Sequence, residues 1–189
     1  MTNSPATDVP GLTEALRPVL IDLLLAAADD ALMLGHRNSD WTGIGPMLEE
    51  DIAFSAFAQD DMAHAKALYE IAEPLAGRTA DQLAFGREPS AYRCATIVEL
   101  ADDFDWARAI TRLFFCTHFN LLRFNRMARS SWSELGQLAS RLAAEQQIAV
   151  EHINGWVVRL GRGTDESHQR MTRAFDMLRE HARMLPEPI

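Results

Sequence analysis

The sequence predicts an all-α fold in which four long helices form an antiparallel bundle and a further helix is added at the C-terminus. Three observations lead to this prediction. Apolar residues recur with the helical period over five long stretches, residues that start or stop helices bound each stretch, and no stretch alternates polar and apolar residues as a strand does. Long amphipathic helices of this kind are typical of a bundle.

The first predicted helix covers about residues 12–34 and ends at Gly35, a residue type that often terminates helices. A polar connection with two glycines, HRNSDWTGIG, follows it. Pro46 then begins a second helix, because proline is favoured in the first turn, and this helix stops before Pro74. Residues 74–94 are predicted to form a loop that contains at most a short helix.

Two more bundle helices are predicted beyond this loop. Asp102 is the expected N-cap of the third, which runs to about Arg129. The stretch SWSE, residues 131–134, has the Ser-x-x-Glu form of a capping box and opens the fourth helix, which ends near Gly161.

The last helix is predicted over residues 165–184, with Thr164 or Asp165 as its cap. Neither a fixed-period repeat nor a low-complexity segment interrupts the pattern. We therefore expect one helical domain over residues 12–185, after a flexible N-terminal segment of residues 1–11.

Composition argues against several classes of function. Lys and Arg number 18 and Asp and Glu number 27, and the net charge of -9 argues against binding to nucleic acid or to an anionic membrane. Cys94 and Cys116 have no CxxC spacing, which favours reduced thiols. The apolar stretch VLIDLLLAAADDALML is interrupted by Asp22, Asp29 and Asp30, so it falls short of the about 20 apolar residues of a membrane span. A soluble, cytoplasmic protein is expected.

One stretch of the second helix, QDDMAH, places a carboxylate and an imidazole three residues apart. Asp61 and His64 project from one face of the helix and could hold a metal ion between them. They also interrupt an apolar stripe, where a charged carboxylate costs several kcal/mol unless it is paired or ligates something. The stripe consists of Phe54, Phe57, Asp61, His64, Leu68 and Ile71.

Two interpretations of this motif stay open. In the first, Asp61 and His64 form a buried hydrogen-bonded pair that Asp30 from the first helix joins. In the second, Asp30, Asp61 and His64 bind a single metal ion. A complete dimetal site is disfavoured because it needs a second Asp/Glu-x-x-His turn, and Glu145 in the fourth helix is followed three residues later by Ile148. The predicted inner stripe of that helix is Leu138, Leu142, Glu145, Ala149 and Trp156.

Two stretches, ALMLGHRNSDWTGIGPMLEEDIAFSAFAQDDMAHAKALYEIAEPLAG and GWVVRLGRGTDESHQRM, resemble the phenylacetic acid catabolic protein family. That family contains the ferritin-like subunits of the multicomponent monooxygenase that epoxidises the ring of phenylacetyl-CoA. The connection GHRNSDW resembles the structural C subunit, whereas QDDMAH is closer to the catalytic A subunit. The resemblance covers about residues 31–178 and implies a ferritin-like bundle.

The resemblance also implies where the iron ligands of the A subunit fall in this chain. Of those six positions only Asp61 and His64 hold residues that can ligate iron, so no tightly bound cofactor is expected. The alternative is a metal-dependent oxidoreductase with a single iron ion on Asp30, Asp61 and His64. The six positions are Ala31, Asp61, His64, Thr117 or a near neighbour, Gln146 and Ala149.

A non-catalytic structural component, similar to the family's C subunit, is therefore the preferred function. The resemblance implies a catalytic ferritin-like partner and a place where acyl-CoA docks, and a homo-oligomer is the other expected assembly. The third predicted helix carries apolar residues on more than one side over residues 110–122, which also predicts a partner. The chain ends at Ile189, earlier than expected for C subunits, so a surface built from later residues would be missing.

Three further features have a structural interpretation and a functional one. Arginines at third-residue spacing could hold the phosphates of CoA, but a solvated face is the commoner case. Two tryptophans near helix ends usually close a core, and a cysteine without a histidine partner is usually a buried structural thiol. The residues are Arg123, Arg126 and Arg129 with Lys66 and Arg78, then Trp41 and Trp156, then Cys116.

Overall fold

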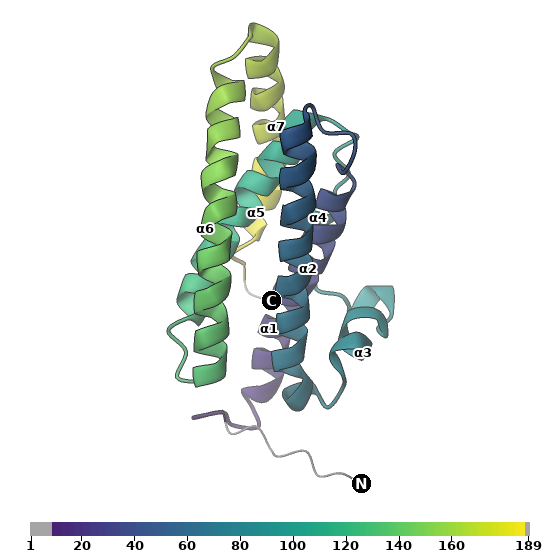
Figure 1. The fold of residues 1–189 in the computed structure, drawn as a ribbon. Helices are drawn as coiled ribbons and strands as arrows, with labels where there is room; N and C mark the ends of the chain where they lie inside the picture. The colour runs from purple at the N-terminus through teal and green to yellow at the C-terminus, as the bar shows by residue number, and fades with distance from the viewer. Residues whose placement is uncertain (1–8, 188–189) are drawn as a thin grey trace.

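The computed structural model describes residues 9–187, so residues 1–8 of the predicted flexible segment lie outside the described part. All regular structure within these residues is helical, which confirms the all-α prediction (Figure 1). The long helices are α1 (Arg17–Ser39), α2 (Leu48–Ala76), α5 (Trp106–Met127), α6 (Ser133–Gly161) and α7 (Asp165–Met184). The short ones are α3 (Ala80–Phe85), the 3₁₀ helix η1 (Pro89–Ala91) and α4 (Thr96–Glu99).

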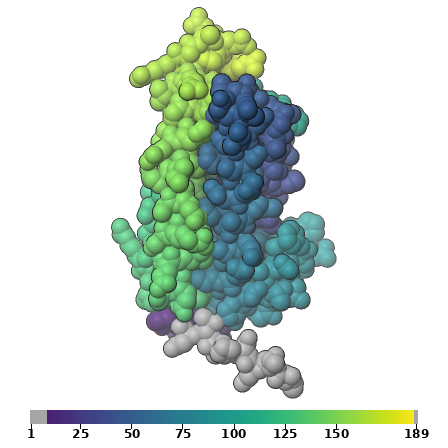
Figure 2. All heavy atoms as spheres, viewed as in Figure 1, coloured from purple at the N-terminus to yellow at the C-terminus, as the bar shows by residue number. Residues whose placement is uncertain are grey.

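The long helices pack as two antiparallel pairs, α1 with α2 and α5 with α6 (Figure 1). The connection that carries α3, η1 and α4 returns from the end of α2 to the other end of the bundle, so α2 and α5 run in the same direction. Figure 2 shows α6 and α2 side by side on one face, with the α3 region beside the lower half of α2. One core cluster contains Leu24, Leu68 and Leu142, and a second contains Phe54, Ile110 and Ile153.

The first helix does not end at Gly35, as the sequence predicted. It continues to Ser39, and Gly35 lies in its interior against α2. A Cβ atom at this position would lie 3.1 Å from the carbonyl oxygen of Ala58 and 3.2 Å from the Cβ atom of Asp61. The glycine therefore allows α1 and α2 to approach closely and does not terminate the helix.

The second helix begins at Leu48 and not at Pro46, and it passes through Pro74. The predicted stop at Pro74 is wrong because the proline stands in the last turn, where it removes a single hydrogen bond to the carbonyl of Glu70, a solvent-exposed residue. Gly77, with φ of 65°, ends the helix in the left-handed conformation, and its N–H donates to the Glu73 carbonyl at 2.9 Å.

The start of α5 also differs from the prediction. Asp105 is the N-cap, and its carboxylate accepts from the N–H of Arg108 at 3.2 Å. Asp102 is buried instead, where it accepts from the indole N–H of Trp41 at 3.0 Å and from Arg112 at 2.6 Å. A carboxylate that was expected to cap a helix thus joins the start of α5 to the end of α1.

The predicted capping box at the start of α6 is absent. This helix begins at Ser133, and Trp132, its N-cap, makes no side-chain cap. A capping box occurs instead at α3, where Thr79 and Gln82 exchange hydrogen bonds with each other's backbone N–H. The last helix has its predicted bounds, with Thr164 as its cap.

Helix α7 covers part of the second apolar side of α5. Phe175 of α7 contacts both Phe114 and Phe115, with ring centroids 5.5 and 5.3 Å apart. Leu122 at the far end of α5 stays 63% exposed. Most of the apolar surface on the second side of α5 is therefore covered by α7 of the same chain. No helix among residues 9–187 is long and apolar enough to cross a membrane.

The close approach at Gly35 generates a test. Gly35→Ala should lower the free energy of unfolding by about 1–3 kcal/mol, since the new methyl group meets the backbone of α2. Gly155→Ala in α6 is the matched control: nothing lies within 4 Å of its Cβ position, so it should raise stability by about 0.5–1 kcal/mol. Urea unfolding measures both, and a stabilising Gly35→Ala would contradict the close approach.

Candidate functional site

A small cavity lies between α2, α5 and α6 at the level of the QDDMAH motif. Its volume of about 10 Å³ is at the lower limit for one water molecule. The cavity contains the polar interruption of the α2 stripe, so the sequence located it correctly on that helix. Its lining residues are Phe57, Asp60, Asp61, His64, Leu113, Thr117, Glu145, Gln146 and Ala149.

His64 is buried and pairs with Glu145 of α6, with 2.8 Å between Nε2 and a carboxylate oxygen. Burial lowers the pKa of His64 below its ordinary value, against the opposing effect of Glu145. A neutral imidazole that donates from Nε2 to the carboxylate satisfies both groups. Glu145 also contacts Arg141 at 3.3 Å and is half-exposed, so this pair lies where the seam between α2 and α6 meets solvent.

Asp61 is buried and accepts a hydrogen bond of 2.9 Å from the side-chain amide of Asn38, at the end of α1. Burial raises the pKa of Asp61 to about 8, and the Asn38 hydrogen bond only partly offsets this. The carboxyl group is therefore largely protonated at neutral pH.

The predicted hydrogen-bonded pair of Asp61 and His64, joined by Asp30, is not what the structure contains. Asp61 pairs with Asn38, and His64 pairs with Glu145. The physical reason is direction: Asp61 projects from α2 toward Asn38 of α1, whereas His64 projects toward Glu145 of α6, so the two side chains meet different helices.

Asp30 belongs to another polar cluster, formed around α1. Its carboxylate accepts from Arg123 of α5 at 2.9 Å and from the N–H of Ala95 at 2.8 Å. Burial raises its pKa above the ordinary value, while Arg123 and Ala95 oppose the shift. Within residues 9–187, no three His, Cys, Asp or Glu side chains lie together as a metal site requires. The structure thus does not bring Asp30 to Asp61 and His64.

Gln146 and Thr117 complete the polar lining of the cavity. Gln146 is 3% exposed, and its Oε1 atom has no hydrogen-bond partner in the described part of the chain. The hydroxyl of Thr117 donates to the Phe114 carbonyl of its own helix at 3.3 Å. Polar atoms therefore face the cavity without forming a ligand set.

Sequence reasoning missed Asn38 and Glu145 as the partners of the motif. Asn38 was assigned to a loop because α1 was ended at Gly35; with the helix continued, it lies one turn beyond Leu34 on the buried face. Glu145 was placed on the inner stripe of α6, yet Gln146 is the buried neighbour and Glu145 lies at the edge. The continuous helical period through Gly35 was the available signal for Asn38.

The resemblance to the A subunit implied six ligand positions, and five of them line this one cavity: Asp61, His64, Thr117, Gln146 and Ala149. The sixth, Ala31, is buried on α1. Two iron ions need about four carboxylates and two imidazoles, whereas four of these six positions hold alanine, threonine or glutamine. The residues present do not fit a di-iron centre.

The other candidate residues mostly have structural surroundings. Trp41 and Trp156 belong to the second core cluster, and Cys116 is a free, buried thiol whose pKa burial raises to about 12. Among the basic residues, Arg123 is bound to Asp30 and Lys66 contacts Glu70 at 3.5 Å. Arg78 donates to backbone carbonyls of the α3 region, and Arg126 and Arg129 are exposed.

Comparison with known proteins matches this chain, over residues 2–188, to the family described as phenylacetic acid catabolic protein. The chain belongs to the phenylacetic acid catabolic protein family. It is 30% identical over 155 residues to the C subunit of the 1,2-phenylacetyl-CoA epoxidase of Escherichia coli (strain K12). The match covers 82% of this chain and 62% of that relative, so the chain spans less than two thirds of its length.

The raised pKa of Asp61 predicts a pH dependence with a definite sign. Between about pH 4 and pH 8 the unfolded chain loses the Asp61 proton while the folded chain keeps it, so stability falls with rising pH by up to about 1.4 kcal/mol per unit. Asn cannot ionise and can still accept from Asn38. Asp61→Asn should therefore gain stability relative to the parent between pH 5 and pH 8, in melts with a chelator present.

Asp176→Asn, at an exposed aspartate of α7 far from the cavity lining, is the matched control and should keep the pH trend of the parent. An Asp61→Asn variant that is less stable than the parent at pH 8 would overturn the assignment of a protonated carboxyl group.

Proposed function

We propose that this chain is a non-catalytic, ferritin-like subunit of a multicomponent oxygenase that acts on an aromatic acyl-CoA in phenylacetate catabolism. One observation carries the proposal: five of the six positions that the resemblance equates with iron ligands line one cavity, yet three of these five hold threonine, glutamine and alanine. Such a chain keeps the architecture of an iron-binding subunit without the chemistry.

The arrangement of the helices supports the ferritin-like part of the proposal. Four-helix bundles with one long crossover, which places the second and third long helices parallel, are typical of ferritin-like folds. Here the connection between α2 and α5 is that crossover (Figure 1). In such bundles the metal ligands project inward from facing helices, and α2, α5 and α6 present Asp61, Thr117 and Gln146 in this way.

The electrostatics of the cavity support the non-catalytic part. Iron prefers deprotonated carboxylates and neutral imidazoles with open coordination positions. In this chain Asp61 accepts from the neutral side-chain amide of Asn38, and the Nε2 atom of His64 is bound to Glu145, so both side chains already have protein partners. Oxidation would then take place on a catalytic ferritin-like partner, and this chain would stabilise that partner and contribute to the docking of acyl-CoA.

The proposal predicts the metal content and the activity of the purified protein. Protein purified without chelator should carry less than one iron per chain by elemental analysis and should consume no oxygen with phenylacetyl-CoA. Oxygen uptake should begin only when the iron-binding subunit is added, together with its reductant, and sedimentation should show a stoichiometric complex. Two irons per chain, or turnover by the chain alone, would contradict the proposal.

A variant separates a structural role of the cavity from a catalytic one. His64→Gln keeps an N–H donor for Glu145 but is a poor iron ligand. In the assembled complex it should change kcat by less than about twofold. A loss of about a hundredfold or more, with the melting temperature of the complex unchanged, would place His64 in the chemistry.

A further inference from the structure

A groove separate from the small cavity lies between α2 and α3, with a volume of about 460 Å³. Its lining comes mainly from α2 and from the two ends of α3, and α1 contributes Leu32. No part of the candidate functional site uses it. Its lining residues are Leu32, Met62, Ala65, Lys66, Tyr69, Glu70, Glu73, Thr79, Ala80, Asp81, Ala84 and Phe85.

The floor of this α2–α3 groove is small and apolar, and its walls are large and apolar. Ala65 and Ala84, 1% and 7% exposed, leave space that larger side chains would fill. Met62 and Phe85 stand at the sides with 44% and 72% of their surface exposed. Large apolar side chains around a hollow are a common mark of an interaction site.

Helix α3 has only six residues, and side chains from the following connection hydrogen-bond to it. Its C-terminal carbonyls accept from side chains: Arg87 donates to Leu83 at 2.5 Å, and the hydroxyl of Tyr92 donates to Ala84 at 2.7 Å. Arg78 donates to the carbonyl of Gly86 at 2.9 Å. The wall that carries Phe85 is therefore fixed in place before anything binds, which reduces the entropic cost of binding.

The rim of the groove is acidic. The lining residues include three carboxylates, Glu70, Glu73 and Asp81, and one cationic side chain, Lys66. Lys66 contacts Glu70 at 3.5 Å in a solvent-exposed pair. Glu73 accepts from the backbone N–H of Ala80 and is partly used in this way. The rim thus has an excess of negative charge beside an apolar floor, which is complementary to a segment with apolar residues and flanking Lys or Arg.

We propose that the α2–α3 groove is a docking site for a basic amphipathic helix of another polypeptide. Apolar side chains of that helix would fill the space over Ala65 and Ala84, and its cations would pair with Glu70 and Asp81. The proposal does not depend on the proposed function.

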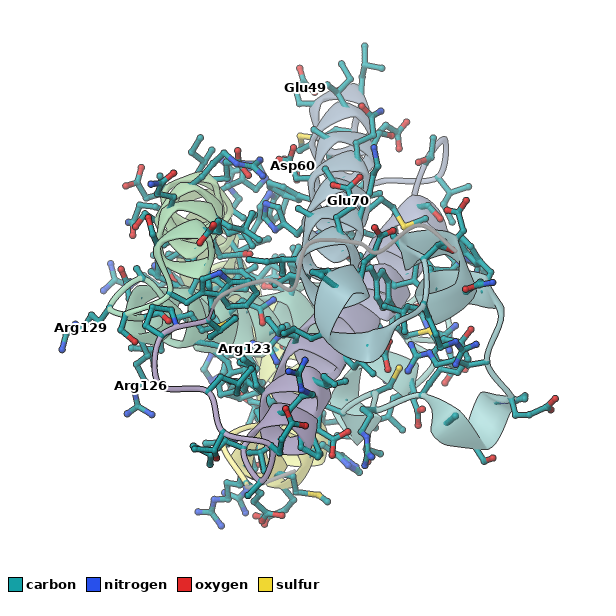
Figure 3. The ribbon with its side chains drawn as sticks, turned by 90° about the horizontal axis from the view of Figure 1, so that it is seen from below. Glu49, Asp60, Glu70, Arg123, Arg126 and Arg129 are labelled. Atoms are coloured by element: carbon teal, nitrogen blue, oxygen red, sulfur yellow. The ribbon has the colours of Figure 1, made fainter. Side chains whose placement is uncertain are left out.

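A second copy of the chain fits less well. One of its exposed basic pairs, Arg126 and Arg129 at the end of α5, lies at the edge of the molecule, away from Glu70 on α2 (Figure 3). The acidic groove and the basic pair therefore face different directions. A self-contact between them would be head-to-tail, and such contacts close into rings only at particular rotations.

The test uses a fluorescent helical peptide of about 16 residues, with leucine on one face and arginine on both flanks, and the full chain. Asp81→Lys and Phe85→Ser should each weaken binding about tenfold or more, because they remove the charge and the wall. Asp176→Lys on α7 repeats the charge change, and Ile148→Ser, at 70% exposure on α6, matches Phe85. Both controls should change binding less than about twofold.

Several outcomes would overturn the proposal. Equal weakening by Asp81→Lys and Asp176→Lys would show general attraction to an acidic chain, and equal binding of a peptide with glutamate for arginine would refute the charge complementarity. Self-association of the chain in sedimentation, abolished by Phe85→Ser, would identify a second copy as the occupant. Thermal melts confirm that each variant is folded, since both groove residues are exposed.

Discussion

Two adjacent buried carboxylates in α1, Asp29 and Asp30, constrain how α2, the crossover and α5 pack around that helix. Asp29 has no exposed side-chain surface, and it is bound by Arg87, by the hydroxyl of Tyr69 at 2.5 Å and by the N–H of Arg93 at 2.7 Å. The carboxylate of Asp30 forms an ion pair with Arg123 of α5 at 2.9 Å. Because buried charges must be compensated, the crossover has to lie against α1, and α5 has to present its arginine there. The hydroxyl of Tyr69 lies on α2, so this pair of carboxylates joins α1 to α2, to the crossover and to α5.

The seam between α2 and α6 follows a related rule on a smaller scale. These helices share few close contacts, and two reciprocal imidazole–carboxylate pairs bridge them: His64 with Glu145, and His152 with Glu50 at 2.9 Å. Each helix contributes one imidazole and one carboxylate. Hydrogen bonds between these partners fix the register of α6 on α2, because a shifted helix would leave buried polar atoms unpaired.

Helix α7 explains how a chain with so much apolar surface on α5 covers most of it. Its buried residues Met171, Ala174 and Leu178 join the second core cluster, and Phe175 packs against the aromatic side of α5. The added helix therefore acts as a fifth wall and leaves the outer side of α2 and α3 uncovered. This arrangement fits the family and the proposed non-catalytic function. Hydrogen-bonded side chains line the small cavity, while the outer surface of α2 and α3 stays open to a partner.

By itself the sequence determined the local features: the long helices, the bounds of α7 and the inward stripe of α2 with Asp61 and His64. It also showed that α6 has no second Asp/Glu-x-x-His turn. Helical periodicity and residue type are properties of neighbouring residues, so they can be read without the tertiary structure. Only the tertiary structure decided the pairings. Asn38 reaches Asp61 across 23 residues and Glu145 reaches His64 across 81, which depends on how the helices pack. Gly35 shows the link between the two, because a residue that locally favours a helix end is held inside the helix by the close approach of α2.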